Sequence, residues 1–191
     1  MLIIVAVSIF TYTAIESALV WLGWDKKSPE ALWRPIAFLV GTGAVLLLNS
    51  SWRWVWKKAP ALSTVIFPDL TGEWKGVLHS SWVNPETNEK VPPIKVRFFI
   101  SQSLLSFGIT LQTKESKSYS NRYWLERRPD QHCYRLWYTY TNEPKQAFRF
   151  RSSEHAGVAF LELDLSSSRD HLTGRYFTSR NTTGDIELER S

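Results

Sequence analysis

Residues 36–58 read IAFLVGTGAVLLLNSSWRWVWKK, an apolar run followed by a tryptophan-rich basic exit. The run from Ile36 to Leu48 carries no charge, and the tryptophans after it extend the apolar length to about 20 residues, enough to span a bilayer. Tryptophan side chains with Arg53, Lys57 and Lys58 among and behind them are typical of a membrane–water boundary, and excess Lys and Arg marks the cytoplasmic side. The stretch therefore predicts a transmembrane helix whose exit, with everything after it, is cytoplasmic.

The chain before this stretch predicts another transmembrane helix. Met1 to Leu22 is almost entirely apolar, and it lacks the basic region and the small-residue cleavage site of a secretory signal peptide. Trp21 and Trp24 mark an interface, and the polar residues after them join the two apolar runs into a hairpin. We therefore expect residues 1–58 to be a two-helix membrane anchor with both termini cytoplasmic.

The anchor contains candidates for contacts between helices. Glu16 lies inside the first run, where an ionisable side chain is costly unless it faces a partner or water. Gly41 and Gly43 permit two helices to approach closely. We assign these three residues to oligomerisation. The alternatives are that Glu16 lies near an interface and that the glycines are ordinary residues of a membrane helix.

Residues 59–68 read as a short linker, and from Asp69 the sequence changes to alternating aromatic and β-branched segments separated by turn residues. Because most connections are short, neighbouring strands should pair antiparallel. Closing the sheet on itself would remove exposed edges and enclose about one small ligand. Residues 69–191 are therefore expected to form an eight-stranded antiparallel up-and-down β-barrel. The expected strands are Thr71–Trp82, Ile94–Gln102, Leu105–Lys114, Ser120–Arg128, His132–Thr141, Ala156–Leu165, Leu172–Arg180 and Thr183–Arg190.

Composition excludes several classes of function. From Leu70 onward the chain has 17 Lys and Arg against 14 Asp and Glu, a net charge of +3, which does not favour binding of long nucleic acid. A single Cys133 excludes an internal disulfide, and the four histidines fall at no metal-ligand spacing. No nucleophilic triad, phosphate-binding loop or zinc motif is recognisable. We therefore expect neither an enzyme nor a metal or cofactor site.

The first expected strand opens with Leu70-Thr71-Gly72-Glu73-Trp74, which resembles the Gly-x-Trp start of lipocalins and avidins, where the Trp plugs one end of the barrel. Leu172-Thr173-Gly174-Arg175-Tyr176 resembles a later avidin-like strand. Two apolar helices followed at once by such a barrel are similar to the two-transmembrane, β-strand-rich effectors of the antiphage system CBASS, which are associated with cGAS/DncV-like nucleotidyltransferases. This resemblance covers essentially the whole chain. It implies a cytoplasmic barrel that senses a cyclic nucleotide made after infection, and helices that then assemble and disrupt the bacterial inner membrane in abortive infection.

A cyclic dinucleotide offers bases that stack on aromatic rings and phosphates that bind Arg or hydroxyl groups. Tyrosines on one face of the fifth strand could face a tyrosine, a hydroxyl and a cation on the seventh, with the first and fourth strands completing the pocket. The same aromatic residues would equally fit a packed core. A membrane-tethered, lipocalin-like carrier or sensor of a hydrophobic molecule is the alternative function. The candidate ligand residues are Tyr134, Tyr138, Tyr140, Tyr176, Thr178, Arg180, Arg122, Trp124, Ser80 and Trp82.

Overall fold

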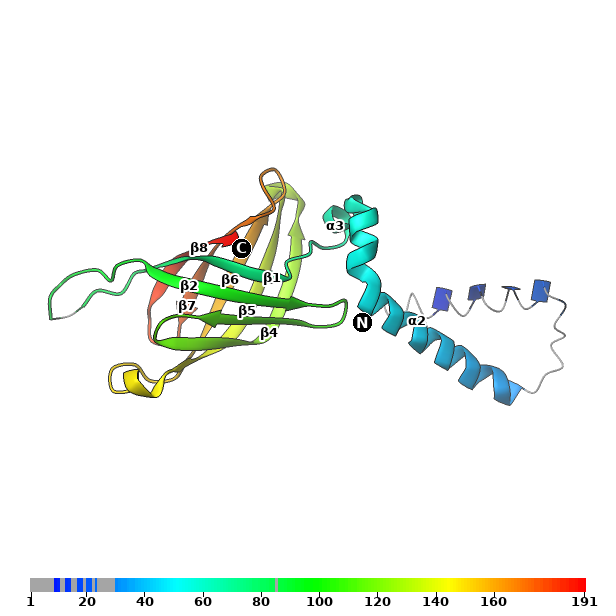
Figure 1. The fold of residues 1–191 in the computed structure, drawn as a ribbon, viewed down its shortest axis with the longest axis horizontal. Coiled ribbons are helices and arrows are strands. Elements are labelled where there is room, and N and C mark those ends of the chain that lie inside the picture. Colours follow the sequence, from blue (N-terminus) through cyan, green and yellow to red (C-terminus); the bar gives the residue numbers. More distant parts are fainter. Residues whose placement is uncertain are drawn as a thin grey trace. The chain divides into compact units, whose positions relative to one another are not determined.

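A computed structural model describes residues 9–10, 13–14, 17–18, 20–21, 23, 30–84 and 86–191. They belong to two compact units, Met1–Lys58 with Ser103–Leu105, and Ala59–Gln102 with Ser106–Ser191. The described residues of the first unit are mainly helical, and the second unit is a barrel of strands with a short helix before it (Figure 1).

The main described element of the first unit is the helix α2, Glu30–Lys58, which contains the second apolar run. The rings of Trp52 and Trp56 meet edge to face in its last turns, with centroids 5.6 Å apart. Within the part of the chain that the structure describes, no helix is both long and apolar enough to cross a membrane. Most of the first apolar run lies outside the described residues, so the two-helix anchor stays a prediction.

The residues assigned to oligomerisation are described only in part. Glu16 lies outside the described residues. Gly41 and Gly43 both lie in α2, and a Cβ built on Gly43 would meet no atom within 4 Å. The space beside Gly43 is what a close helix contact requires, but the contact itself stays a prediction.

In the described residues of the second unit, eight strands form a closed barrel in which each strand pairs antiparallel with its neighbours in chain order and the last pairs with the first. This confirms the predicted up-and-down barrel. A short helix, α3 (Pro60–Val65), lies in the expected linker, and the 3-10 turns η1 (Pro129–Gln131) and η2 (Gln146–Phe148) lie in connections. The strands are β1 (Gly72–Ser80), β2 (Ile94–Gln102), β3 (Phe107–Gln112), β4 (Ser116–Arg128), β5 (Cys133–Pro144), β6 (His155–Asp164), β7 (His171–Thr178) and β8 (Thr183–Arg190).

The barrel is filled by one inward face of each strand, because successive side chains of a strand point to opposite faces. On β2 and β5 this gives an almost unbroken alternation of buried and more exposed residues. The largest fully buried side chains are Trp74, Tyr134, Phe98, Leu70, Leu136, Leu161, Leu163, Leu172, Ile186 and Leu188. These side chains form one apolar core inside the barrel.

Trp82 does not lie inside the barrel, contrary to the expected first strand. The pairing of β1 with β8 ends at Ser80 and Gly184, and the N–H of Trp82 donates instead to Ser80 Oγ at 3.2 Å. Trp82 is 43% exposed. The strand stops early because its partner strand begins only at Thr183.

A bulge in β4 determines which of its aromatic residues faces inward. The pairing of β4 with β5 shifts by one residue between Ser120 and Arg122. After this shift Tyr123 and Leu125 lie opposite inward-facing residues of β5, and Trp124 points outward with 67% of its surface exposed.

The end of the barrel at which the chain enters β1, here called the linker end, is plugged by Trp74. Its indole nitrogen donates to Leu70 O at 2.9 Å. The Gln102 amide accepts from Leu70 N–H at 2.8 Å and donates to Pro68 O at 3.0 Å, which fixes the chain below the plug. This confirms the plugging role that the Gly-x-Trp motif implied.

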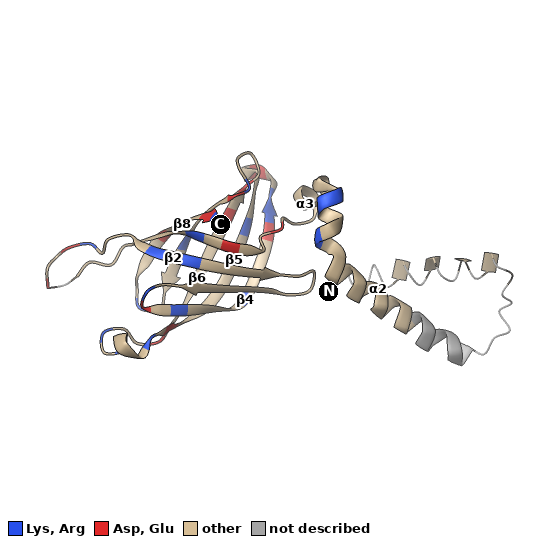
Figure 2. Ribbon diagram, in the orientation of Figure 1, with Lys and Arg blue, Asp and Glu red and all other residues tan. Residues whose placement is uncertain are grey.

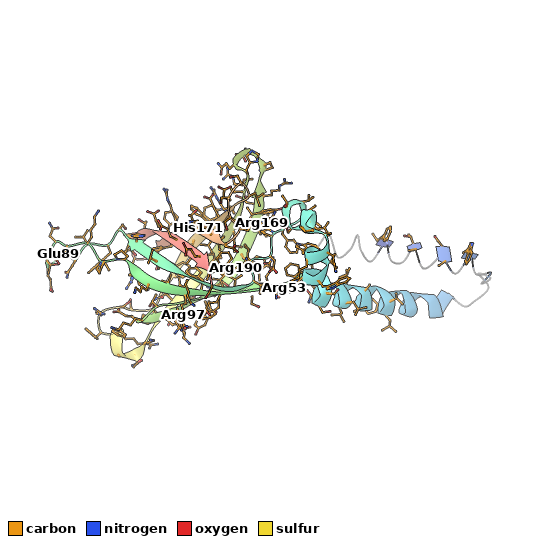
Figure 3. All side chains as sticks on the ribbon, turned by 45° about the horizontal axis from the view of Figure 1, so that its top comes forward. Arg53, Glu89, Arg97, Arg169, His171 and Arg190 are labelled. Carbon is orange, nitrogen blue, oxygen red and sulfur yellow. The ribbon has the colours of Figure 1, made fainter. Side chains whose placement is uncertain are left out.

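α3 is attached to the barrel at the same end. Arg169, in the connection from β6 to β7, donates to Ser63 Oγ at 2.5 Å and to Thr64 Oγ1 at 2.6 Å. The Tyr134 hydroxyl donates to Thr64 O at 3.0 Å. Figure 3 labels Arg169 and Arg190 among the side chains of the barrel. Part of the expected linker is therefore a helix fixed to the barrel.

Candidate functional site

The opposite end of the barrel, here called the far end, is where β1, β3, β5 and β7 finish and the even-numbered strands begin. The connections 81–93, 113–115, 145–154 and 179–182 surround it. No tryptophan plugs this end in the described residues. Polar side chains instead face the interior here, so the far end is where a ligand could enter.

Inward side chains of β5 to β8 and β1 form two rows near this end. A Cβ built on Gly157 would lie 2.3 Å from Tyr140 Cζ, and one on Gly184 would lie 2.6 Å from Tyr176 Cε1. The rings of Tyr140 and Tyr176 therefore pack directly over glycines of the neighbouring strands. The deeper row reads Tyr138, Ala159, Tyr176, Gly184 and Ser80, and the outer row reads Tyr140, Gly157 and Thr178.

Three tyrosines of these rows form one cluster. The ring centroids of Tyr138 and Tyr140 are 6.0 Å apart. Burial, and then the Tyr140 hydroxyl, raises the pKa of Tyr138 far above its ordinary value. Burial and the Tyr176 hydroxyl raise the pKa of Tyr140 to about 12, although Arg180 acts in the opposite direction. Burial also raises the pKa of Tyr176. All three phenols are therefore neutral at pH 7 and can donate hydrogen bonds.

Arg180 brings a cation to the cluster, although not from a strand as expected. It lies in the turn after β7, where Asn181 takes a left-handed φ of 59° and ends the pairing. Its Nη1 donates to Ser152 Oγ at 3.2 Å. The positive charge of Arg180 also lowers the pKa values of Tyr140 and His155, against burial in Tyr140 and together with burial in His155.

His155 adds a titratable group at the same rim. Its Nδ1 lies 3.0 Å from Ser153 O. Burial lowers the pKa of His155, and the neighbouring Arg180 lowers it further, against the effect of the Ser153 carbonyl. The imidazole is therefore neutral at pH 7.

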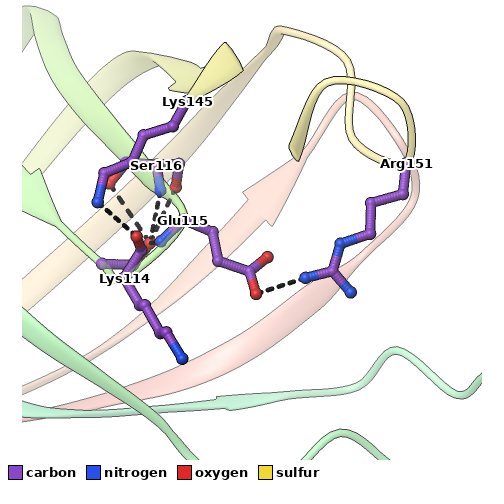
Figure 4. A network of polar contacts seen from close by, with 6 residues as sticks. Lys114, Glu115, Ser116, Lys145 and Arg151 are labelled. Carbon is purple, nitrogen blue, oxygen red and sulfur yellow. Dashed lines mark hydrogen bonds and ion pairs between the residues drawn. The ribbon is translucent and has the colours of Figure 1, made fainter. Parts of the chain in front are cut away.

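Polar contacts fix the connections at the rim (Figure 4). Lys145 donates from Nζ to Lys114 O at 2.5 Å, and its backbone N–H donates to Glu115 O at 2.8 Å. Arg151 Nη2 lies 2.5 Å from Glu115 Oε1. These contacts therefore fix the connections 113–115 and 145–154 to each other. They also fix the position of Ser152, whose hydroxyl contacts Arg180.

A hollow of about 510 Å³ opens where β7, β8 and β1 meet at this end. Ser80 and Tyr176 line it, together with the basic side chains of Lys90 and Arg175. Its volume lies within the range of roughly 300–1,000 Å³ typical of small-molecule sites. Two of the predicted ligand residues thus share a hollow with cations that the sequence had not singled out.

Four predicted ligand residues lie elsewhere. Tyr134 begins β5 and contacts α3 at the linker end, because six residues of strand, about 20 Å, separate it from Tyr140. Arg122 and Trp124 point outward after the bulge of β4, and Trp82 lies exposed beyond the end of β1. The structure therefore keeps Ser80, Tyr138, Tyr140, Tyr176, Thr178 and Arg180 together at the far end.

Sequence reasoning missed a buried polar pair near the cluster. Ser118 Oγ donates to Asn142 Oδ1 at 2.8 Å, and both residues are buried. The alternation of Ser116, Ser118 and Ser120 is a signal for one strand face, but the expected fourth strand began only at Ser120. His155 was missed because it stands at the very start of its strand.

Two comparisons with known proteins cover the barrel. The family model described as Cap15, cyclic dinucleotide receptor domain, matches residues 65–190, which include every strand of the barrel. A relative named CD-NTase-associated protein 15, from Staphylococcus schleiferi, is 25% identical over 183 residues, which cover 95% of this chain and 88% of the relative. The family match covers more than half of the chain.

Proposed function

The chain belongs to the family of Cap15 cyclic dinucleotide receptor domains, and on this premise we propose that its barrel binds a cyclic dinucleotide second messenger at the far end. The observation that carries the proposal is the cluster of three neutral tyrosines at this end, with the rings of Tyr138 and Tyr140 6.0 Å apart and Tyr176 lining the hollow of about 510 Å³, while Arg180 is held at the rim by Ser152. The opposite end is plugged by Trp74 and occupied by the linker.

Each part of the ligand has a counterpart in the cluster. Bases stack on the rings of Tyr140 and Tyr176, a contact worth about 1–3 kcal/mol per base. Phosphates accept from Arg180 and from the hydroxyls of Thr178 and Ser80. Neutral phenols suit an anionic ligand because they donate hydrogen bonds without adding negative charge.

The charge distribution favours a small anion over long nucleic acid. Basic and acidic residues are interspersed over the barrel (Figure 2), and several basic side chains are paired, as Arg175 is with Asp185 and Arg151 with Glu115. Contacts along a phosphate backbone need clustered Lys and Arg on one face. The cations at the far end are few and local, which suits a compact ligand.

We further propose that the chain is an antiphage effector, in which ligand binding drives assembly of the N-terminal helices in the inner membrane, with the barrel cytoplasmic. Support comes from the apolar runs, the basic exit of α2, and the relative whose name associates it with a CD-NTase. A single hairpin cannot enclose an aqueous path without leaving polar groups against lipid, so membrane damage requires several copies. Glu16, Gly41 and Gly43 are the proposed contacts in this homo-oligomer.

Isothermal calorimetry on the chain from Ala59, which forms a compact unit, tests the ligand proposal with a panel of cyclic dinucleotides. We expect at least one of them to bind. Arg180→Ala should weaken its binding about tenfold or more, because a charge-assisted phosphate contact is lost. Lys95→Ala is the matched control, since Lys95 is exposed and points outward on β2.

Equal losses in both variants would show that the site lies elsewhere on the barrel. If no cyclic dinucleotide bound while a fluorescent fatty acid did, the barrel would be a carrier of hydrophobic molecules and the proposal would fail.

A further inference from the structure

The barrel is closed, but the hydrogen-bonded ladder between β3 and β4 is short. Their pairing comprises Thr110 to Gln112 against Lys117 to Tyr119, and beyond it the Ile109 N–H donates to the Ser120 side chain at 2.8 Å instead of to a backbone carbonyl. β4 continues to Arg128 and pairs with β5 along this whole length. Within the described residues, 121–128 therefore have a ladder partner on one side only. We call this segment the β4 edge.

The exposure of the β4 edge agrees with an open strand. A strand inside a barrel wall alternates buried and exposed residues, but Asn121, Arg122, Tyr123 and Trp124 are all exposed. Tyr123 is 44% exposed even though its ring packs on Phe107 with centroids 5.3 Å apart. A hollow of about 490 Å³ lies where the ladder between β3 and β4 ends, and Gly108, Tyr119 and Ser120 form part of its lining. An open edge of this kind is a template for another strand.

We propose that the β4 edge pairs antiparallel with the β4 edge of a second copy of this chain, across a two-fold axis at Trp124. In this register Trp124 lies opposite Trp124 of the second copy, and Tyr123 lies opposite Leu125. Arg122 lies opposite Glu126, and the symmetry produces this pair twice. Each of these cross-strand pairs is favourable, whether aromatic, apolar or oppositely charged.

Other registers lose this complementarity. Sliding the copies by two residues in one direction sets Arg122 against Arg128 of the second copy, and in the other direction it sets Glu126 against Ser120. Sliding by one residue brings an inward-facing side chain of one copy opposite an outward-facing one of the other. The charges therefore select the register centred on Trp124.

The side chains that would form the new ion pairs are available. Arg122 and Glu126 have no ion-pair partner within the part of the chain that the structure describes, whereas Arg135, which lies opposite Glu126 on β5, is taken by Glu162. On the outer face Trp124 lies beside Trp137, whose ring is 4.8 Å from that of Phe160. Pairing of two copies would join these aromatic rows into one.

Cysteine cross-linking of the full chain in membranes tests the arrangement. A residue on the two-fold axis meets its own copy at a Cα separation that a disulfide can bridge, so Trp124→Cys should form a covalent dimer under mild oxidation. Phe177→Cys, on the outer face of β7 and 43% exposed, is the matched control and should not. The unsubstituted chain controls for the natural Cys133, which is buried.

Charge reversal tests the register. In the Trp124→Cys chain, Arg122→Glu alone sets two acidic groups against each other and should lower the yield of dimer about tenfold, the factor that roughly 1.4 kcal/mol gives. Adding Glu126→Arg should restore the yield. No ligand enters this test, so its result is independent of the proposed function. The proposal would be overturned if Trp124→Cys formed no covalent dimer, or if Phe177→Cys formed as much dimer as Trp124→Cys. It would also be overturned if the yield of dimer did not change with the charges at positions 122 and 126.

Discussion

The guanidinium carbon of Arg190 lies 4.3 Å from the centroid of the Trp74 ring, so the last strand of the barrel stacks on the plug carried by the first. Arg190 also donates to Thr71 O at 2.8 Å and to Asp69 O at 2.9 Å. One side chain thus joins the C-terminal strand, the plug and the incoming chain. A planar guanidinium is suited to this because it stacks and forms directed hydrogen bonds at once.

Arg190→Lys should therefore destabilise the barrel. Lysine keeps the charge but loses the planar stacking and at least one of the two backbone contacts, so the free energy of unfolding should fall by about 1–3 kcal/mol. Urea unfolding of the chain from Ala59 measures this. Arg175→Lys is the control, because the Arg175 side chain is 66% exposed and its ion pair with Asp185 lies at the surface. A loss no larger than that of the control would contradict the role given to Arg190.

High pH should destabilise the barrel through the tyrosine cluster. The pKa of Tyr140 is about 12 in the folded state, above its ordinary value of 10.0, and that of Tyr138 is raised as well. The folded state therefore holds these protons more tightly than the unfolded state, and the stability present below pH 10 is lost as the pH rises from about 10 to 12.

Two measurements follow this change. Ultraviolet absorbance of the phenolate reports deprotonation of the tyrosines, and urea unfolding at each pH reports the free energy of unfolding. Tyr140→Phe should flatten the loss of stability over that range, whereas Tyr119→Phe, on an exposed residue, should leave it unchanged. A stability that is independent of pH between 9 and 12 would show that the cluster is not closed to water.

The alternation of the sequence predicted the barrel because a strand with one buried face repeats every second residue. β2 and β8 have the expected bounds, and Trp74 plugs the barrel as the Gly-x-Trp motif implied. The length of a strand, however, depends on its partner. Trp82 continues the alternation of β1, but β8 offers it no residue to pair with.

The candidate site was predicted in part, and for the same physical reasons. Tyr138 and Tyr140 follow from alternation on β5, and so does Tyr134, but alternation does not tell which end of a strand holds a ligand. The outward turn of Arg122 depends on a bulge, which adds one residue and reverses the faces without a marked sequence signal. Arg180 reaches the cluster from a turn, so its position depends on turn geometry and not on strand period.

Gly157→Ala should close the space that the Tyr140 ring fills. The added Cβ would lie 2.3 Å from Tyr140 Cζ and 2.5 Å from the backbone oxygen of Phe177, and a strand carbonyl cannot move aside without breaking its ladder. We expect the affinity for the cyclic dinucleotide to fall at least about tenfold, a loss of roughly 1.4 kcal/mol. Calorimetry measures it, with Gly108→Ala as the control, because no atom lies within 4 Å of a Cβ at Gly108. Unchanged affinity in Gly157→Ala would mean that the ligand does not touch this wall.

Glu16→Leu tests the proposed assembly separately from ligand binding. The substitution removes an ionisable group from the first apolar run, so the proposed contacts between helices should weaken while the barrel is untouched. We expect binding of the cyclic dinucleotide to be retained, and ligand-dependent clustering and toxicity to fall. Single-molecule counting in membranes measures the clustering. Membrane damage without any change in oligomer size would refute assembly as the mechanism.

The contacts of α3 predict how a signal could leave the barrel. Arg169 holds Ser63 and Thr64 from the β6–β7 connection, and the Tyr134 hydroxyl holds the Thr64 carbonyl. Tyr134 lies on the same strand as Tyr138 and Tyr140, so a ligand that shifts β5 would act on α3 directly.

Arg169→Ala should therefore free α3, which hydrogen exchange detects as faster exchange of the amides of residues 60–66. Ligand affinity should stay the same, because Arg169 lies at the linker end, while ligand-dependent clustering of the full chain should decrease. Arg149→Ala, which removes an exposed arginine from a connection at the far end, is the control. Unchanged exchange in Arg169→Ala would show that α3 is held by other contacts, and unchanged clustering with faster exchange would show that α3 does not transmit the signal.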